Sequence, residues 1–369
     1  MNKSKQPVLY LRGLKSIPLS VFCVDKEQKF FYDPIYCNYN SNNRKLPYSS
    51  GQQVKRSIME EFLSALNVQR SSVTFVFKQP KLSEAEVLSL CDPNYPDQLI
   101  GGWMLAKDKD DKKKGKKKEK DSEEKDDNVL KRRSPLSISA MVPLHPLLVG
   151  YHEENVSFDR SDNKDLHKVK IRNENGDFLS EEEVQNILDN THRDLYRKWI
   201  PSKGRASGLF VYDVAIDLRT LFSVSVHDLS STIELDSKKW IRSKNIFGDC
   251  WTLCKEEREK IIPALAHALI HWRITSNQAR TFSLMETLAV AISDNANAQA
   301  GAIRAKLIDD GGDKPKAKPI VDEKAGADLF VALPCAAYIV VENESADALE
   351  AAEKHLIHLM QSFDYENQC

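Results

Sequence analysis

Apolar residues at helical spacing mark the clearest element of the sequence, at residues 51–67. They recur every three or four positions, as expected for one buried face of a helix, and Ser49 or Ser50 can cap its start. The apolar positions are Val54, Ile58, Met59, Phe62, Leu63 and Leu66. Similar spacing predicts helices over 256–272 and 346–363, the second of them amphipathic.

Apolar runs with strand character separate these helices. The sequence predicts strands over 8–14, 209–218 and 282–292, and a long apolar strand over 329–341 that Pro334 interrupts. Strands and helices in this order, with long excursions between them, predict an α+β fold of ferredoxin-like type that carries insertions. No internal repeat is visible.

Two polar segments lie inside the excursions. Residues 107–127 (KDKDDKKKGKKKEKDSEEKDD) contain almost only Lys, Asp and Glu, so we expect a solvated loop within a larger insertion. Further on, basic and apolar residues alternate over 167–172, and Asn175-Gly176 is a hairpin turn signal. This alternation predicts Lys168, Lys170 and Arg172 on one face, and an ordinary solvated hairpin is the alternative.

Composition narrows the class of protein. No apolar run is long enough for a membrane span, and the amino-terminal sequence lacks a secretory signal, so we expect no membrane association and a cytoplasmic location. The seven cysteines are scattered, which favours reduced thiols. Lys and Arg total 53 against 54 Asp and Glu. Because the basic residues cluster around 44–56, 164–172 and 193–205, local basic patches are still expected.

The start of the helix at 51–67 carries an unusual charge pattern. In PYSSGQQVKRSIMEEF (47–62), Lys55 and Arg56 fall where acidic residues are electrostatically preferred. A helix amino end already offers unpaired N–H groups and partial positive charge. A phosphate could therefore be held by the backbone together with Ser50, Gln52, Lys55 and Arg56. The alternative is that these side chains extend into water.

The same segment resembles a motif of a known family. Ser50-Gly51-Gln52-Gln53-Val54-Lys55-Arg56 is similar to the Ser-Ser-Gln-x-x-Lys-Arg segment of the backbone subunit of type I CRISPR interference complexes (Cascade), with Gly51 in place of the second Ser. Two further segments resemble that family in the same order. They are SGLFVYDVAIDLRTL (207–221) and residues 264–294 with Gln278-Ala279-Arg280-Thr281-Phe282. Residues 135–162, with His145, are a weaker match.

The resemblance implies a member of the repeat-associated mystery protein (RAMP) superfamily. Such proteins have a modified RNA-recognition-motif palm, here residues 1–69 and 208–369, with a finger insertion at 70–154 and a thumb hairpin at 155–207. The chain departs from the family at Gly51, in the charged insertion at 107–127, and in an added stretch around 230–250.

Function follows from the resemblance as an expectation. The protein would be a non-enzymatic subunit without cofactor or metal that oligomerises along a guide RNA (crRNA). It would present the guide to a target DNA strand. Its protein partners would be other Cascade subunits and further copies of itself in a helical filament. Base pairing with the guide would recognise the target sequence, while the protein would contact the sugar-phosphate backbone. The implied RNA contacts are Arg44, Lys45, Ser50, Gln52, Lys55, Arg56, Lys168, Lys170, Arg172, Gln278 and Arg280.

Three alternatives stay open at this point. A type III-like subunit would cleave target RNA with a loop aspartate, Asp25 or Asp33. An interaction scaffold would bind acidic proteins and no nucleic acid. Cys250, Cys254, His267 and His271 have the spacing of a zinc finger, but 255–272 is predicted to be one helix, with no room for the hairpin that a finger needs. Buried thiols and satisfied helix histidines are therefore expected, and no metal.

Overall fold

A computed structural model gives the fold. It describes residues 7–21, 29–31, 46–78, 83–106, 129–152, 156–158, 168–191, 198–200, 205–229, 232–275, 282–308 and 315–368. Strands and helices are mixed along the chain, so the fold is α+β as the sequence predicts.

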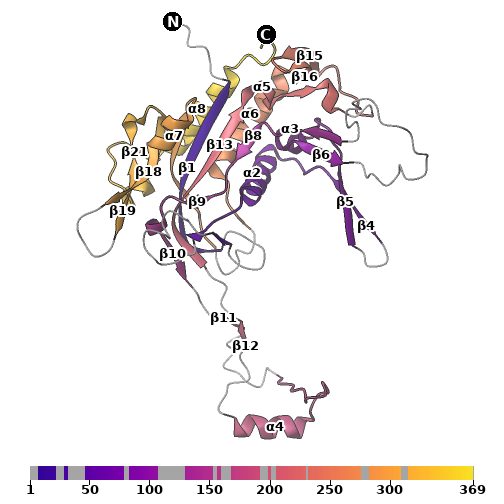
Figure 1. Ribbon diagram of the computed structural model, residues 1–369, viewed down its shortest axis with the longest axis vertical. Coiled ribbons are helices and arrows are strands. Elements are labelled where there is room, and N and C mark those ends of the chain that lie inside the picture. Colours follow the sequence, from indigo (N-terminus) through magenta and orange to yellow (C-terminus); the bar gives the residue numbers. More distant parts are fainter. Residues whose placement is uncertain are drawn as a thin grey trace, which may run out of the picture.

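A sheet of eight strands forms the centre of the molecule (Figure 1). Its order is β10-β13-β1-β17-β20-β21, and β8 and β9 also pair with β13. All of these pairs are antiparallel except β20 with β21. The bounds are β1 Val8–Ser20, β8 Leu136–Ile138, β9 Val142–Pro143, β10 Val149–His152, β13 Arg205–Asp217, β17 Glu286–Ser293, β20 Asp328–Ala332 and β21 Glu344–Ser345.

Side chains of the two long strands alternate between two apolar layers, as the two-residue period of a strand requires. Leu9 and Leu11 of β1, with Tyr212 of β13, belong to the larger core, which the main helices cover. Leu14 and Val211 point to the opposite face and join a smaller core. The sheet is therefore buried on both faces, and this explains the continuous apolar runs in its strands.

The larger core is closed by α2 (Gly51–Leu66), α6 (Lys255–His271) and α8 (Ala348–Gln361). The smaller core is closed in part by α7 (Ala296–Ala302), β18 (Ile303–Ile308), and the 3-10 helix η6 (Leu333–Ala337). α6 packs between α2 and α8, so these helices form one layer over the sheet.

Smaller elements surround this centre (Figure 1). The strand pairs are β2 Phe30–Phe31 with β3 Leu46–Pro47, β4 Val73–Lys78 with β5 Ser83–Ser89, β6 Trp103–Ala106 with β7 Val129–Arg132, β11 Val156–Phe158 with β12 Lys198–Ile200, and β18 with β19 Lys316–Val321. β14 Ser223–Ser225, β15 Trp240–Asn245 and β16 Gly248–Leu253 form a three-stranded sheet. The remaining helices are α3 Pro96–Gly101, α4 Glu181–Asn190, α5 Leu218–Leu221, η2 Pro146–Leu148, η4 Val226–Asp228 and η5 Glu323–Ala325.

The helices predicted over 51–67, 256–272 and 346–363 are confirmed within two residues at each end. The long strand predicted over 329–341 is wrong. β20 ends at Ala332, and a 3-10 helix follows with Pro334 in its first turn. Proline has no N–H for a strand ladder, whereas the start of a helix tolerates it.

The basic segment after residue 167 differs from the prediction in one respect. Asn175-Gly176 does form the turn, and the Gly176 N–H donates to the Asn173 carbonyl at 3.0 Å. Residues 168–171 form no strand, however, and only an isolated bridge joins Arg172 to Phe178. Among the described residues, no strand pairs with 168–171 to extend this bridge into a ladder.

In the part of the chain that the structure describes, no helix has the length and apolar character needed to span a bilayer.

Candidate nucleic-acid interface

The flank of α2 brings together several of the predicted RNA contacts. Val54, Ile58 and Phe62 turn into the core, so Gln52, Lys55 and Arg56 fall on another side of the helix. Met59 extends this flank by one turn, because positions i, i+3, i+4 and i+7 share a face. No acidic residue lies in the first turn.

A cavity of about 420 Å³ lies against this flank. α2 forms one wall, residues 70–73 form another, and α3 with Gly102 forms the third. The lining residues are Gln52, Lys55, Arg56, Met59, Arg70, Ser71, Val73, Asp97, Gln98, Gly101 and Gly102. Its charged groups are therefore three cations and one carboxylate.

Lys55 stands half-buried in the cavity wall. Its Nζ donates to the Gly101 carbonyl at 2.7 Å, which ties α2 to the end of α3. Burial lowers the pKa of this ammonium below its ordinary value. An ammonium has three donors, so an anion in the cavity can still bind the ones that Gly101 does not use.

Arg56 and Arg70 are exposed at the same cavity. The Arg56 Nε donates to Glu60 Oε1 at 2.7 Å, one turn along the helix, and its side chain is 61% exposed. The terminal nitrogens of its guanidinium have no acceptor among the described residues. Arg70 likewise has none there, so both can turn toward an anion.

The single carboxylate of the cavity is only partly satisfied. Asp97 Oδ2 accepts from the Ser71 N–H at 3.2 Å and from the Ser71 hydroxyl at 2.6 Å. Asp97 Oδ1 is buried and has no hydrogen-bond partner among the residues that the structure describes. Sequence reasoning missed Arg70, Ser71 and Asp97, because these residues lie outside the helix. Arg70 and Ser71 come from the segment that follows α2, and Asp97 comes from α3, which packs against α2.

Ser50 and Gly51 are engaged with protein groups. The Ser50 hydroxyl accepts from the Gln53 N–H at 3.3 Å and caps the helix, as predicted for Ser49 or Ser50. A Cβ on Gly51 would lie 3.2 Å from the Ile138 carbonyl oxygen, so glycine suits this close approach. The amino end of α2 thus packs beside β8, and the cations lie along the helix flank.

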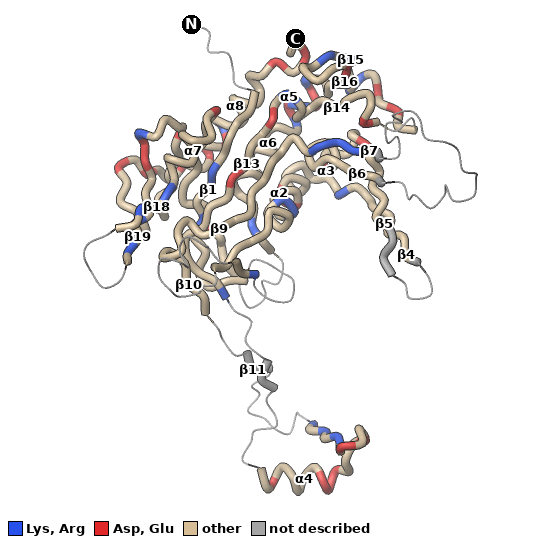
Figure 2. Tube along the Cα trace, in the orientation of Figure 1, with Lys and Arg blue, Asp and Glu red and all other residues tan. Residues whose placement is uncertain are grey.

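The second group of predicted contacts lies elsewhere. Lys168, Lys170 and Arg172 are exposed, and Lys170 and Arg172 lie over the Phe178 ring at 5.4 and 4.3 Å. This basic segment lies beside α4, far from α2 (Figure 2). Outside the described residues are Asp25, Asp33, Arg44, Lys45, the charged segment 107–127, Gln278 and Arg280.

The structure separates the four residues with zinc-finger spacing. Cys254 is the residue before α6, whereas His271 is the last residue of that helix. At 1.5 Å per residue, Cys254 and His267 are about 20 Å apart along the axis. Cys250 and Cys254 are buried thiols, in keeping with the alternative to a finger.

Comparisons with known proteins give only remote similarity. No protein-family model and no curated protein matches this chain. One similar solved chain comes from a CRISPR RNA-guided surveillance complex described as pre-nicking, with 9% identity, a TM-score of 0.40, and 95% of this chain and 89% of that chain covered. A second comes from a CRISPR RNA-guided surveillance complex, with 11% identity, a TM-score of 0.40, and 94% and 99% covered.

Proposed function

We propose that this chain binds the sugar-phosphate backbone of a guide RNA as a non-enzymatic subunit of a type I CRISPR surveillance complex. One observation carries the proposal: Lys55, Arg56 and Arg70 surround a single cavity on the flank of α2. Affinity for nucleic-acid phosphates comes mainly from such cations, which displace counterions. The ordered motifs of the sequence favour a guide RNA over other nucleic acids.

The cavity suits a phosphate better than a base. The Lys55 ammonium and two guanidinium side chains line the cavity as charged donors, and Gln52 adds a neutral amide. Charge-assisted hydrogen bonds to phosphate oxygens are the strong ones, and guanidinium groups can make two at once. Such contacts fix the position of a strand without reading its sequence. Sequence recognition would then come from base pairing between guide and target.

The rest of the chain has a role in this proposal. The central sheet with α2, α6 and α8 would be the palm, of RNA-recognition-motif type, and the segment around α4 would be the thumb. Copies would associate head to tail along the guide, because a heterologous contact that does not close on itself propagates as a filament. Target DNA would pair with the presented guide, and other complex subunits would bind the filament ends.

Binding of a labelled single-stranded RNA over a salt titration tests the cavity. We expect Arg56→Ala with Arg70→Ala to weaken binding and to reduce the slope of log affinity against log salt by about 1.4, since each single-strand phosphate contact contributes about 0.7. These side chains are exposed, so the variant should fold normally. Lys55→Ala should weaken binding too, but it also removes the bond to Gly101.

The matched control is Lys255→Ala with Lys260→Ala, which makes the same change of net charge on α6. These lysines pair with Glu259 and Glu257 on the helix surface. The control should keep the wild-type affinity and slope. Equal behaviour of the two double variants would refute the cavity as a phosphate site.

Assembly on a guide RNA tests the proposal that copies of the chain oligomerise along it within a surveillance complex. We expect the chain, co-expressed with a repeat array, to purify with RNA as a ladder of multiples of its own mass. Ribonuclease treatment should collapse the ladder. A chain that purifies free of RNA as a single species would contradict the proposal, and cleavage of added complementary RNA would favour the type III-like alternative.

A further inference from the structure

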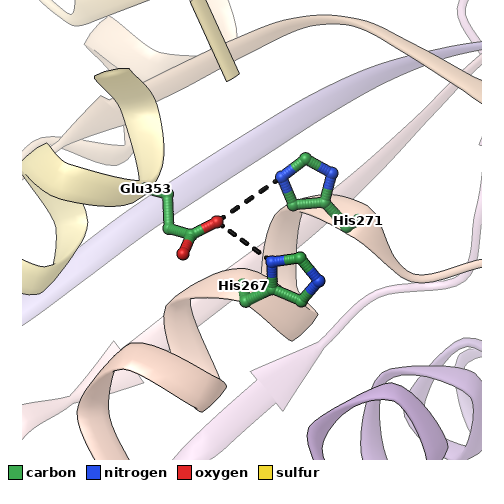
Figure 3. A group of neighbouring side chains, drawn as sticks. All are labelled: His267, His271 and Glu353. Atoms are coloured by element: carbon green, nitrogen blue, oxygen red, sulfur yellow. Dashed lines mark hydrogen bonds and ion pairs between the residues drawn. The ribbon is translucent and has the colours of Figure 1, made fainter. Parts of the chain in front are cut away.

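Three helices bring two imidazoles and two carboxylates to one place on the helical layer. His267 and His271 lie one turn apart on α6 and their rings stack, with centroids 4.5 Å apart and planes at 22°. Glu353 reaches them from α8 (Figure 3). Glu61 of α2 approaches His267 from the other side.

One carboxylate oxygen faces a nitrogen of each ring. Glu353 Oε2 lies 3.1 Å from His267 Nδ1 and 3.5 Å from His271 Nε2 (Figure 3). All three potential ligand atoms lie within 4.8 Å of one another. Two tetrahedral ligands at about 2.0–2.1 Å from Zn²⁺ are separated by about 3.3 Å, because the angle between them is about 109°. The two separations from Glu353 Oε2, 3.1 and 3.5 Å, lie on either side of this value.

The second carboxylate is placed to orient the first ligand. Glu61 Oε1 lies 3.4 Å from His267 Nε2, the nitrogen that does not face Glu353. A proton on Nε2 would be held on that side by the Glu61 charge, and the Nδ1 lone pair would be left free for a metal. Carboxylates hold the tautomer of metal-binding histidines in this way. Glu61 and Glu353 also carry negative charge that offsets a divalent cation.

Water can reach the cluster. The side chains of His267, His271 and Glu353 are 39%, 30% and 25% exposed, so an ion has an entry path and a water can complete a tetrahedron. Two histidines and a carboxylate with one open position form a known zinc donor set. Among the residues that the structure describes, this is the one group of three or more such side chains with converging donor atoms.

We propose that His267, His271 and Glu353 bind Zn²⁺, with water as the fourth ligand and Glu61 as a positioning residue. The proposed site uses His267 and His271 without Cys250 and Cys254, and it departs from the expectation, drawn from the sequence, that the chain binds no metal. The ion would join α6 to α8 directly and to α2 through Glu61, so its effect is to lock the helical layer. It is independent of the proposed RNA contacts.

Metal-stripped full-length protein tests the site. Elemental analysis after dialysis against a zinc buffer should show one Zn²⁺ per chain, and zinc should raise the melting temperature. His271→Gln and Glu353→Gln should each lose the bound zinc and the thermal shift, because each removes a ligand. Glu61→Gln should keep the stoichiometry but weaken affinity roughly 10- to 100-fold, as expected for loss of an orienting carboxylate.

His355→Gln is the matched control. His355 lies on α8 beside a single carboxylate, with its Nε2 3.0 Å from Asp328 Oδ2. The His355→Gln protein should therefore bind zinc as the wild type does. Cys254→Ser should also keep the zinc, which separates this site from the thiols. No zinc in the wild type would overturn the proposal, and so would wild-type zinc binding by either His271→Gln or Glu353→Gln.

Discussion

The ring of Tyr212 covers the backbone of Gly13 on the neighbouring strand. The two residues are partners in the register of β1 and β13, and a Cβ on Gly13 would lie 2.2 Å from Tyr212 Cε1. The Tyr212 hydroxyl then donates to the Leu269 carbonyl on α6 at 2.7 Å. Its ring also meets Trp272 edge to face, with centroids 4.9 Å apart. The missing side chain at Gly13 thus lets β13 bond to the helical layer.

Gly13→Ala should therefore destabilise the protein. The methyl group cannot fit unless the buried ring moves, which breaks the bond to Leu269, and overpacking of this kind costs about 1–3 kcal/mol. Urea denaturation gives the free energy of unfolding. Gly301→Ala is the control, because its Cβ would meet Ala325 at an ordinary 3.6 Å. In a Tyr212→Leu background, Gly13→Ala should cost much less, and an equal cost in both backgrounds would contradict the steric explanation.

Sequence periodicity predicts the helices and the sheet because burial of a face repeats every 3.6 or 2 residues. Gly13 shows no such periodic signal, because the requirement for glycine comes from the Tyr212 ring that packs against it from the neighbouring strand. Lys15 is a second example. The alternation of Leu9, Leu11 and Ile17 predicts an apolar residue at position 15, but the position holds a lysine that is fully buried.

Lys15 should give stability a distinctive dependence on pH. Its Nζ donates to the carbonyls of Trp272 and Met285 and to Thr287 Oγ1 at 3.0–3.3 Å. Burial, with a smaller effect of Arg273, nevertheless lowers its pKa from 10.5 to about 7. Between these two values the unfolded chain binds a proton that the folded chain lacks, so stability rises with pH by at most about 1.4 kcal/mol per unit.

Lys15→Met removes this contribution. Urea denaturation from pH 6 to 9.5 should show a steeper rise of unfolding free energy above pH 7 in the wild type than in the variant. Below pH 7 the two slopes should agree, because Lys15 is then protonated in both folded and unfolded chains. Parallel curves over the whole range would mean that burial leaves the Lys15 pKa at its ordinary value.

Arg132 joins α3 and β7 to α5 and β14 through hydrogen bonds. Its guanidinium donates to the carbonyls of Leu99, Thr220 and Ser223, and it lies 5.5 Å from the Trp103 ring centre. These bonds leave from two separate nitrogens, Nη1 and Nη2, which the single ammonium of a shorter lysine cannot replace together, and each lost bond from a charged donor costs about 1.5–3 kcal/mol. Arg132→Lys should thus destabilise by about 3 kcal/mol or more in urea denaturation. The exposed neighbour Arg133 gives the control, and Arg133→Lys should change stability little.

Part of the candidate site could be predicted from sequence. Local helix chemistry identified Gln52, Lys55 and Arg56, and the structure places them at one cavity. Arg70 and Asp97 could not be found, because helix periodicity carries no information on what packs against a flank. The histidine cluster shows the same limit. His267 and His271 share a face by spacing, but Glu353 and Glu61 come from other helices.

The basic segment beside α4 should add to RNA binding independently of the cavity. Lys168→Ala, Lys170→Ala and Arg172→Ala together should lower the salt slope by about 2, at about 0.7 for each single-strand contact. The segment lies far from α2 (Figure 2), so a variant that combines these changes with Arg56→Ala and Arg70→Ala should show the sum of both effects. The control is Lys306→Ala, Lys316→Ala and Lys318→Ala on the β18–β19 hairpin, which makes the same charge change on another exposed hairpin. If both triple variants lower the slope equally, the segment contributes only its charge and makes no specific contact with the strand.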